Sequence, residues 1–206
     1  VATFQAIKAA GAEPIACDID ERTCLIDLND ASSKISKRTK AIIPVHYTGG
    51  VGNLDELYSF ASKHNLRVIE DAAHAFGTKY KNSFLGTIGD VGLFSMHPRK
   101  NFHVYGDGGL IVTNDTKLYK KLKLIRNHGL QSRDEAIIWG TNSRLDNLQA
   151  AFGRIMIKKI KLWNNKHYKI ANFYEKSLSK FVKTPIYDKR ITKPSFHQYI
   201  IRTKHR

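Results

Sequence analysis

Cysteine, acidic residues and long apolar runs are all scarce in this chain of 206 residues. Its two cysteines, Cys17 and Cys24, flank a short turn in a sequence without secretory features, so we expect reduced thiols rather than a disulfide. With no histidine cluster nearby they also make a poor zinc site, and no metal is predicted. No apolar run approaches the roughly 20 residues of a membrane span, and we expect no signal peptide. These absences predict a cytoplasmic protein.

The shortage of acidic residues leaves a strongly basic chain. Lys and Arg number 34 against 18 Asp and Glu, which gives a formal charge of +16. Basic proteins bind nucleic acid, anionic membranes or phosphorylated ligands. The lysines gather in residues 117–123 and 158–169, which resemble solvated helix faces, and no aromatic-and-basic motif accompanies them. We therefore predict no nucleic-acid or membrane partner, and keep a phosphorylated small molecule or a simple lysine bias as explanations.

An initiator methionine is also missing. Val1 opens straight into helix-like sequence, and the last residues form no terminating element. We expect the chain to be a fragment cut at both ends, so that it would not show by itself whether it folds, dimerises or binds a ligand.

Short apolar runs alternate with helix-like segments in the first half of the chain, the pattern of a sheet with crossover helices. The expected strands are residues 14–17, 40–45, 66–69, 91–95 and 109–113. The unbroken apolar character of residues 40–45 indicates a strand buried on both faces. The sequence therefore predicts an α/β fold with a three-layer α/β/α arrangement around a mostly parallel sheet.

Helix signals lie between these runs. Residues 5–10 look helical with Gly11 as a natural stop, and Asn53 with Glu56 approaches a capping box for the next helix. A helical repeat also runs through residues 118–125.

The second half of the chain changes character. Apolar residues keep a helical period from Leu145 onward, as in a long amphipathic helix that links two domains or packs against a partner subunit. Residues 196–201 look like the first strand of another unit. We expect a large domain over residues 1–144, a connecting helix region over 145–181, and the start of a small C-terminal domain over 182–206.

Asp71 and Lys100 are the pair that points to chemistry. Asp71 closes the apolar run of residues 66–69, so it lies at the carboxyl end of a parallel strand, where open α/β sheets bind ligands. Lys100 lies in the loop after the strand at residues 91–95. A lysine that forms an imine with an aldehyde, and a carboxylate that pairs with a protonated pyridine nitrogen, are what pyridoxal phosphate requires. Separately, Asp71 could simply cap the next turn and Lys100 could be a solvated cation.

Other polar residues surround this pair. Ser95 ends the strand before Lys100 and offers a hydroxyl suited to phosphate, although alone it is a strand-end hydroxyl. His74 could lie over the cofactor ring or bond its phenolic oxygen, or it could be a polar group satisfied within a turn. The glycine-rich residues 106–109 let the backbone approach something closely.

Four ordered blocks resemble the DegT/DnrJ family, pyridoxal-phosphate sugar aminotransferases of fold type I. They are residues 70–75 (EDAAHA), 94–101 (FSMHPRKN), 106–115 (GDGGLIVTND) and 142–151 (NSRLDNLQAA), with weaker matches at 1–3 and 44–46. The resemblance covers nearly the whole chain. It implies the PLP-binding large domain of that fold, truncated at its N-terminus, over residues 1–144.

The resemblance also implies roles for individual residues. Lys100 would be the imine lysine and general acid–base, Asp71 would bond the pyridine nitrogen, and His74 would contact the ring. Ser95 would bind phosphate. Asn142 would reach the cofactor of a neighbouring subunit, which makes the active unit a homodimer with shared sites; alone it would be a turn residue before the helix. Arg144 would serve the same region or the substrate.

Two departures from the family pattern stand out. Gly-Asp-Gly-Gly at 106–109 replaces the more common Gly-Glu-Gly-Gly, and Val104-Tyr105 replace two threonines, which could alter the substrate pocket. The resemblance also implies that the family's small-residue phosphate cup would lie upstream of Val1, and that much of its small C-terminal domain would lie beyond Arg206.

The implied reaction moves an amino group from an amino acid, L-glutamate in this expectation, to a nucleotide-linked ketosugar in amino-sugar biosynthesis for surface polysaccharide or glycan. Neither the nucleotide, the sugar nor the aminated carbon follows from the residues. A dehydratase on the same fold is the nearest alternative, but such relatives carry His where Lys100 stands. A non-catalytic relic or regulatory protein, and a basic nucleic-acid module, remain as alternatives from other classes.

Overall fold

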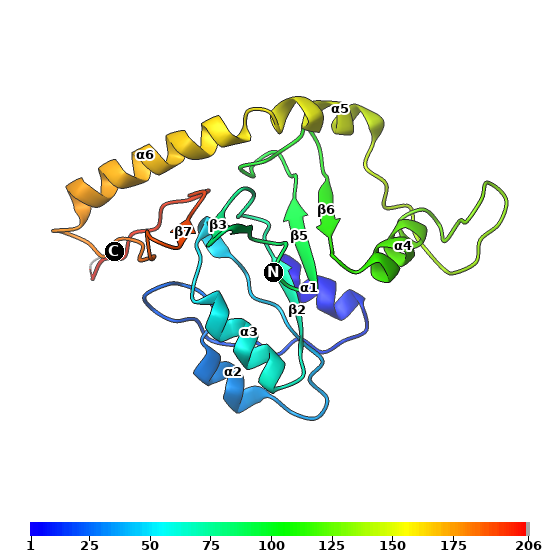
Figure 1. The fold of residues 1–206 in the computed structure, drawn as a ribbon, viewed down its shortest axis with the longest axis horizontal. Helices are drawn as coiled ribbons and strands as arrows, with labels where there is room; N and C mark the ends of the chain where they lie inside the picture. The colour runs from blue at the N-terminus through cyan, green and yellow to red at the C-terminus, as the bar shows by residue number, and fades with distance from the viewer. Residues whose placement is uncertain (205–206) are drawn as a thin grey trace.

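The computed structural model of the protein describes residues 1–204 (Figure 1). Its helices are α1 (Ala2–Ala9), α2 (Leu28–Lys34), the 3-10 turn η1 (Tyr47–Gly49), α3 (Leu54–Lys63), α4 (Thr116–Ile125), α5 (Asn147–Met156) and α6 (Ile160–Leu178). Its strands are β1 (Ala41–Ile42), β2 (Arg67–Asp71), β3 (Lys79–Tyr80), β4 (Ser83–Phe84), β5 (Val91–Ser95), β6 (Gly109–Val112) and β7 (Thr192–Lys193).

The main sheet has the strand order β1-β2-β5-β6. Strands β1, β2 and β5 are parallel, and β6 returns antiparallel to β5, as the opposed arrows in Figure 1 show. A smaller antiparallel sheet joins β4, β3 and β7. The prediction of an α/β fold with a mostly parallel sheet is confirmed. Because β1, β2 and β5 run the same way, their carboxyl ends meet at one edge, where ligands bind in open sheets.

Helix α3 forms where the sequence placed it. Asn53 caps it, since its side-chain oxygen accepts a hydrogen bond from the backbone N–H of Glu56 at 3.3 Å. Leu54 and Leu57 are buried against the sheet in the same cluster as Val68 of β2. This apolar layer fixes β2, and with it the position of the sheet edge where β2 ends.

A second, smaller cluster lies under α5. Met96, Phe102 and Val104 are buried there and pack against Phe152 and Met156 of α5. The segment that contains Lys100 is therefore anchored by buried apolar side chains on both sides of the lysine.

Two predicted strands are wrong. Residues 14–17 form no strand, because Pro14 lacks an N–H to donate and the segment lies outside the main sheet, whose edge strand is β1. Residues 196–201 also form none; the nearest strand is β7, which ends just before them. Phe196 has φ +48°, which an extended strand cannot accommodate. The predicted strand at 40–45 shrinks to β1 and an isolated bridge at Val45, on either side of Pro44.

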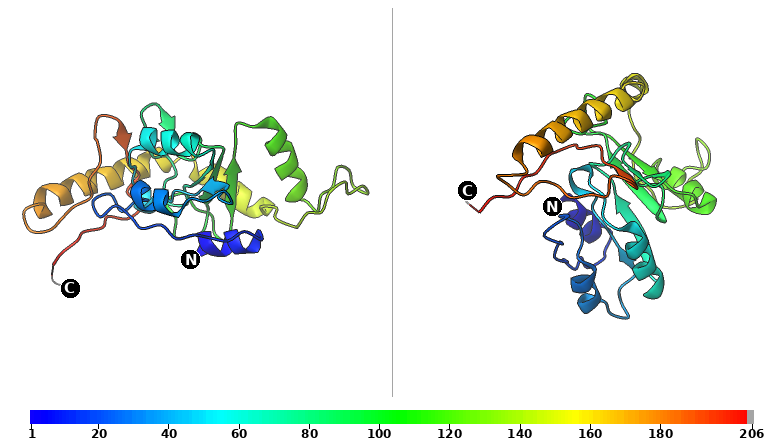
Figure 2. Two further views of the ribbon diagram at one scale, coloured as in Figure 1. Left: turned by 90° about the horizontal axis from the view of Figure 1, so that it is seen from below. Right: turned by 60° about the vertical axis from the view of Figure 1, so that its left-hand side comes forward.

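The long helix predicted from Leu145 onward is also wrong as a single element. It divides into α5 and α6, because hydrogen bonds to the third preceding residue, from Lys159 N–H to the Met156 carbonyl and from Ile160 N–H to the Ile157 carbonyl, interrupt it. Helix α6 runs along one side of the molecule beside the C-terminal segment (Figures 1 and 2). The division into residues 1–144, 145–181 and 182–206 stays a prediction, and residues 205 and 206 lie outside the described residues.

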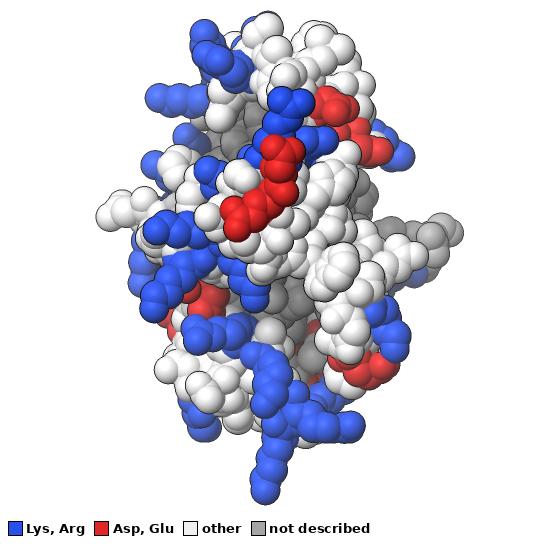
Figure 3. Space-filling view, turned by 90° about the vertical axis from the view of Figure 1, so that its right-hand side faces the viewer, with Lys and Arg blue, Asp and Glu red and all other residues white. Residues whose placement is uncertain are grey.

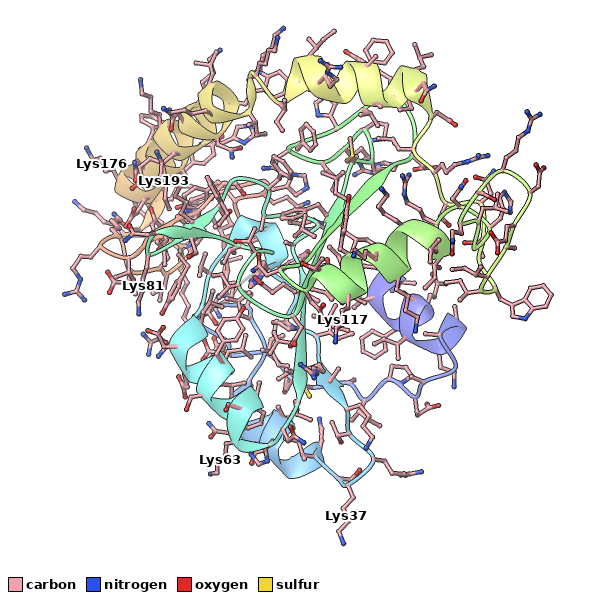
Figure 4. All side chains as sticks on the ribbon, turned by 45° about the vertical axis from the view of Figure 1, so that its right-hand side comes forward. Lys37, Lys63, Lys81, Lys117, Lys176 and Lys193 are labelled. Carbon is pink, nitrogen blue, oxygen red and sulfur yellow. The ribbon has the colours of Figure 1, made fainter. Side chains whose placement is uncertain are left out.

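Basic side chains are scattered over the surface. Figure 3 shows Lys and Arg distributed from top to bottom of one face, with few acidic groups between them. The lysines labelled in Figure 4 extend outward from different helices, strands and turns. This distribution is that of solvated lysines on many elements. Within residues 1–204, no helix has the length and apolar character of a bilayer-crossing segment.

Candidate active site

Asp71 ends β2 at the carboxyl edge of the sheet, as predicted. Its Oδ1 accepts a hydrogen bond from the backbone N–H of Ala73 at 3.1 Å, and its Oδ2 accepts one from the Thr3 hydroxyl at 2.8 Å. The carboxylate thus does cap the following turn, which was the simpler interpretation of this residue. Since an ionised carboxylate has about four acceptor positions, these two bonds leave room for a further donor.

Lys100 lies in the loop after β5, close enough to Asp71 for their charges to interact. The Lys100 side chain is half-buried; burial and the neighbouring Arg99 lower its pKa, and Asp71 opposes that shift. The adjacent residue Asn101 is buried, and its side-chain amide donates to the Phe76 carbonyl at 2.8 Å. Because of that bond, the Lys100 loop is held against the turn that follows Asp71.

His74 completes this group. Its Nδ1 accepts a hydrogen bond from the backbone N–H of Thr48 at 3.3 Å, so the ring's proton belongs on Nε2. Burial and the Lys100 charge lower the pKa of His74, and Asp71 opposes the shift. The structure therefore brings together three of the residues that the sequence singled out: Asp71, His74 and Lys100.

Ser95 lies at the end of β5, beyond the point where Leu93 pairs with Asp71. Its hydroxyl accepts a hydrogen bond from the His97 N–H at 3.3 Å, in the first turn of the Lys100 loop. Gly108 approaches this loop closely, as its sequence predicted, because its carbonyl accepts from the Met96 N–H at 2.7 Å. A Cβ at Gly108 would lie only 2.9 Å from Leu145 Cδ1.

Asn142 is placed elsewhere in this chain. It lies exposed in the segment between α4 and α5, which loops out from the body of the molecule (Figure 1). Its Oδ1 accepts from Arg144 Nε at 3.1 Å, and Arg144 also donates to Asn127 at 3.2 Å. These contacts tie Asn142 to its own segment rather than to Asp71 or Lys100.

The buried pair of His46 and Glu70 was missed by the sequence reasoning. Glu70 precedes Asp71 on β2, points to the opposite face, and is 0% exposed. Its carboxylate meets His46 Nε2 at 2.9 Å and accepts from the backbone N–H groups of Gly86, Ile88 and Gly89 at 2.7–2.9 Å. Burial would raise the pKa of Glu70, but these bonds lower it to about 2. The sequence signal that could have revealed the pair is Glu70 itself, an acidic residue that directly follows the apolar residues Val68 and Ile69.

His46 also contributes through its backbone. Its N–H donates to the Asp71 carbonyl at 3.0 Å, and the Asp71 N–H donates to the Pro44 carbonyl at 2.9 Å. The Glu70–His46 pair thereby fixes the backbone that carries Asp71. Thr48, whose N–H bonds the His74 ring, lies only two residues after His46 in the sequence.

A lysine and a carboxylate at one sheet edge, with a histidine whose pKa both charges affect, can hold a cofactor that has an aldehyde and a basic ring nitrogen. Asp71 retains acceptor capacity and Lys100 is only partly buried, so both residues fit pyridoxal phosphate. Over residues 1–204, no group of three or more His, Cys, Asp or Glu side chains is arranged to hold a metal ion.

Comparison with known proteins agrees with this chemistry. A family model described as the DegT/DnrJ/EryC1/StrS aminotransferase family matches residues 1–206. A curated UDP-2-acetamido-2-deoxy-3-oxo-D-glucuronate aminotransferase of Pseudomonas aeruginosa is 40% identical, over 86% of this chain and 50% of its own length. A pleiotropic regulatory protein of Geobacillus stearothermophilus is 39% identical, over 100% of this chain and 56% of its own length.

A solved structure agrees as well. The crystal structure of S. venezuelae DesV in complex with a ketimine intermediate matches with a TM-score of 0.94 and 35% identity, over 100% of this chain and 56% of that one. The chain thus spans about half the length of the curated and solved relatives that it matches.

Proposed function

Because the chain belongs to the DegT/DnrJ/EryC1/StrS aminotransferase family, we propose that the whole protein moves an amino group from an amino acid to a nucleotide-linked ketosugar. The observation that carries this proposal is that Asp71 ends β2 and Lys100 lies in the loop after β5, the parallel strand paired with β2, so that both come from one edge of the sheet. L-Glutamate is the proposed donor, and amino-sugar biosynthesis for surface polysaccharide or glycan is the proposed role. The relative from Pseudomonas aeruginosa that is named as a UDP-sugar aminotransferase supports the acceptor class.

Pyridoxal 5'-phosphate is the proposed cofactor. Lys100 would hold its aldehyde, Asp71 its ring nitrogen, His74 its ring and Ser95 its phosphate. When bound, the cofactor supplies an electron sink for the carbon that loses its proton. The amine of Lys100 would take that proton from the donor's α-carbon as general base, and as general acid it would deliver a proton to the sugar carbon that receives the amino group. Its lowered pKa favours this role, since a base must be available unprotonated.

A homodimer is the proposed active unit. Asn142 is exposed on a projecting segment and makes its hydrogen bonds there, so it is available to a second copy rather than to its own site. We place the protein in the cytoplasm because Cys17 and Cys24 are free thiols, as is usual in a reducing compartment.

The test is spectroscopic. The protein, expressed from its complete reading frame and mixed with pyridoxal phosphate, should develop a visible absorbance band that borohydride removes. Lys100→Ala should abolish the band, whereas Lys63→Ala, at an exposed lysine in the last turn of α3, should keep it. A band that persists in the Lys100 variant would refute the assignment.

A regulatory function is the second candidate, because one 39% identical relative carries the name of a pleiotropic regulatory protein. The same experiment separates the two. Absence of the band in the wild-type protein would favour a regulatory role, and its presence together with amino transfer to a panel of nucleotide ketosugars would favour the enzyme.

A further inference from the structure

Residues 195–198, far along the chain, are bonded to the wall of the candidate site. The Ser195 hydroxyl donates to the His74 carbonyl at 3.2 Å, across 121 positions of sequence. The Ser195 N–H donates to the Thr78 hydroxyl at 3.0 Å, which in turn donates to the Gly49 carbonyl at 3.1 Å. Ser195 and Thr78 are both buried. Residues 195–198 are therefore held against the candidate site by buried hydrogen bonds.

Gly49 makes room for this segment. Its φ is +84°, in the left-handed region that favours glycine, and a Cβ there would collide with the Ser195 hydroxyl. Any other residue at position 49 would both strain the backbone and displace Ser195.

The backbone of Phe196 is strained. It has φ +48°, which is an outlier for a bulky residue. Its ring packs against Tyr187 and Tyr199, with centroids 5.4 and 6.0 Å away, and against Tyr168 of α6 at 6.1 Å. Such strain persists where the surroundings hold it, and it is common at functional sites. Here the kink buries Phe196 among tyrosines and presents the next side chain to the site.

That next side chain is His197, whose ring is tilted by 56° to the ring of His74, with centroids 4.6 Å apart. His197 is half-buried. The titratable groups around it are His74 on the turn after β2, Lys100 on its loop, and His167 on α6. Burial first, and then these three groups, lower the pKa of His197 to about 4. Within residues 1–204, the buried Nδ1 of His167 beside it has no hydrogen-bond partner.

We infer that His197 is a further substrate-binding residue, which donates a ring N–H to an anionic oxygen of the substrate beside Lys100 and His74. A neutral imidazole among basic groups has a free donor and an environment that favours an anion. The anionic oxygen belongs to the carboxylate of the amino donor or to the diphosphate of the sugar nucleotide. The inference rests on the proposed function, because it assigns a residue to the substrate of that same site.

Histidine NMR tests the contact without any turnover. The ¹³Cε1 resonance of His197, assigned from its loss in His197→Gln, is followed against pH in the protein without cofactor. Succinate represents the donor carboxylates, and UDP represents the diphosphate. Binding of an anion beside the ring should shift this resonance and raise the pKa of His197, because the anion stabilises the imidazolium. The resonance of His64, whose ring contacts Phe60 at a tilt at the end of α3, should not move.

Calorimetry with the same probes identifies the source. His197→Gln and His197→Ala should weaken the dissociation constant of one probe about tenfold, the usual effect of losing a hydrogen bond to a charged group. His64→Gln should leave both constants unchanged. A weaker succinate constant assigns the donor carboxylate, and a weaker UDP constant assigns the diphosphate.

Unchanged constants for both probes, or a His197 resonance that neither probe shifts in the wild-type protein, would overturn the inference. The visible band of the Lys100 experiment reports on the proposed function separately. If that band forms in His197→Gln while anion binding is unaffected, the proposed function stands and the His197 inference falls.

Discussion

Glu70 accepts four hydrogen bonds in a site that water does not reach. A charged group is costly to bury unless its acceptors are filled, and the three backbone N–H groups and His46 do so here. Glu70 lies on β2 next to Asp71. The stability of the fold and the geometry of the candidate site therefore depend on the same carboxylate.

The pH dependence of stability should reflect this carboxylate. Its pKa falls from 4.5 to about 2 on folding, so it stabilises the folded protein above pH 4.5, and that contribution is lost as the pH falls toward 2. Glu70→Gln should lower the free energy of unfolding at pH 7 by on the order of 3 kcal/mol and flatten its decline between those pH values. Urea denaturation at pH 7 and pH 3 measures both effects. Glu135→Gln, in an exposed loop, is the control and should change neither.

A second prediction concerns the charges of the site. Asp71 is the anion that opposes the lowered pKa of both Lys100 and His74. Asp71→Asn should therefore lower the pKa of both groups further. Histidine NMR titration measures the pKa of His74. The pH dependence of Lys100 acylation, followed by mass spectrometry, measures the pKa of the amine. Asp107→Asn, in an exposed loop, should leave both unchanged; an unshifted His74 in the Asp71 variant would mean that the two groups do not interact.

At the scale of residues, the sequence sufficed for side chains that lie at the end of a strand or in the loop after it. The position of Asp71 follows from the apolar run before it, and that of Lys100 from the strand and glycine-rich block around it. His197 could not be found this way, because its place depends on Ser195 bonding to a carbonyl 121 positions earlier. Glu70 and His46 become a pair only once β1 and β2 lie side by side, which no local pattern states.

Helices and strands were predictable where local signals agree. The predicted strand at 91–95 matches β5, and the Asn53 cap of α3 is confirmed. Where packing decides, the sequence misled: an apolar run at 196–201 suggested a strand, but Phe196 turns inward to meet tyrosines from α6 and its own segment. The break between α5 and α6 carries neither proline nor glycine at Ile157–Lys159, so periodicity alone extended the helix across it.

The cap of α3 gives a prediction at the scale of elements. Asn53→Ala should lower the free energy of unfolding by about 1 kcal/mol, because the Glu56 N–H loses its acceptor. Thermal or urea denaturation measures this loss. Asn53→Asp should restore most of it, since aspartate caps equally well. Equal loss in both variants would show that packing, not the cap, governs this helix end.

The outline of the whole molecule bears on its assembly. Trp139 is 99% exposed on the segment that projects between α4 and α5 (Figure 1). A large aromatic side chain in water on a projecting segment is typical of an interface residue. It lies near Asn142 in sequence, so the surface that would carry Asn142 to a second copy also carries an apolar anchor.

Removal of that anchor should weaken self-association. Trp139→Ser should shift the mass measured by analytical ultracentrifugation from dimer toward monomer at micromolar concentration, with at least a tenfold weaker dimer constant. Phe84→Ser, at an exposed aromatic of β4, is the matched control and should keep the wild-type mass. A Trp139 variant that remains as dimeric as the wild type would remove this segment from the interface.

The hydrogen bonds of Ser195 also set an order of events during synthesis. Chains emerge from the ribosome N-terminal end first, so β2, β5 and the Lys100 loop can form while the serine is still inside the exit tunnel. Until it appears, the His74 carbonyl lacks the Ser195 hydroxyl as its donor, and the Thr78 hydroxyl bonds the Gly49 carbonyl without accepting from the Ser195 N–H. This side of the candidate site is thus completed late, and a nascent chain stalled before this point would hold Lys100 and Asp71 without the Ser195 segment bonded beside them.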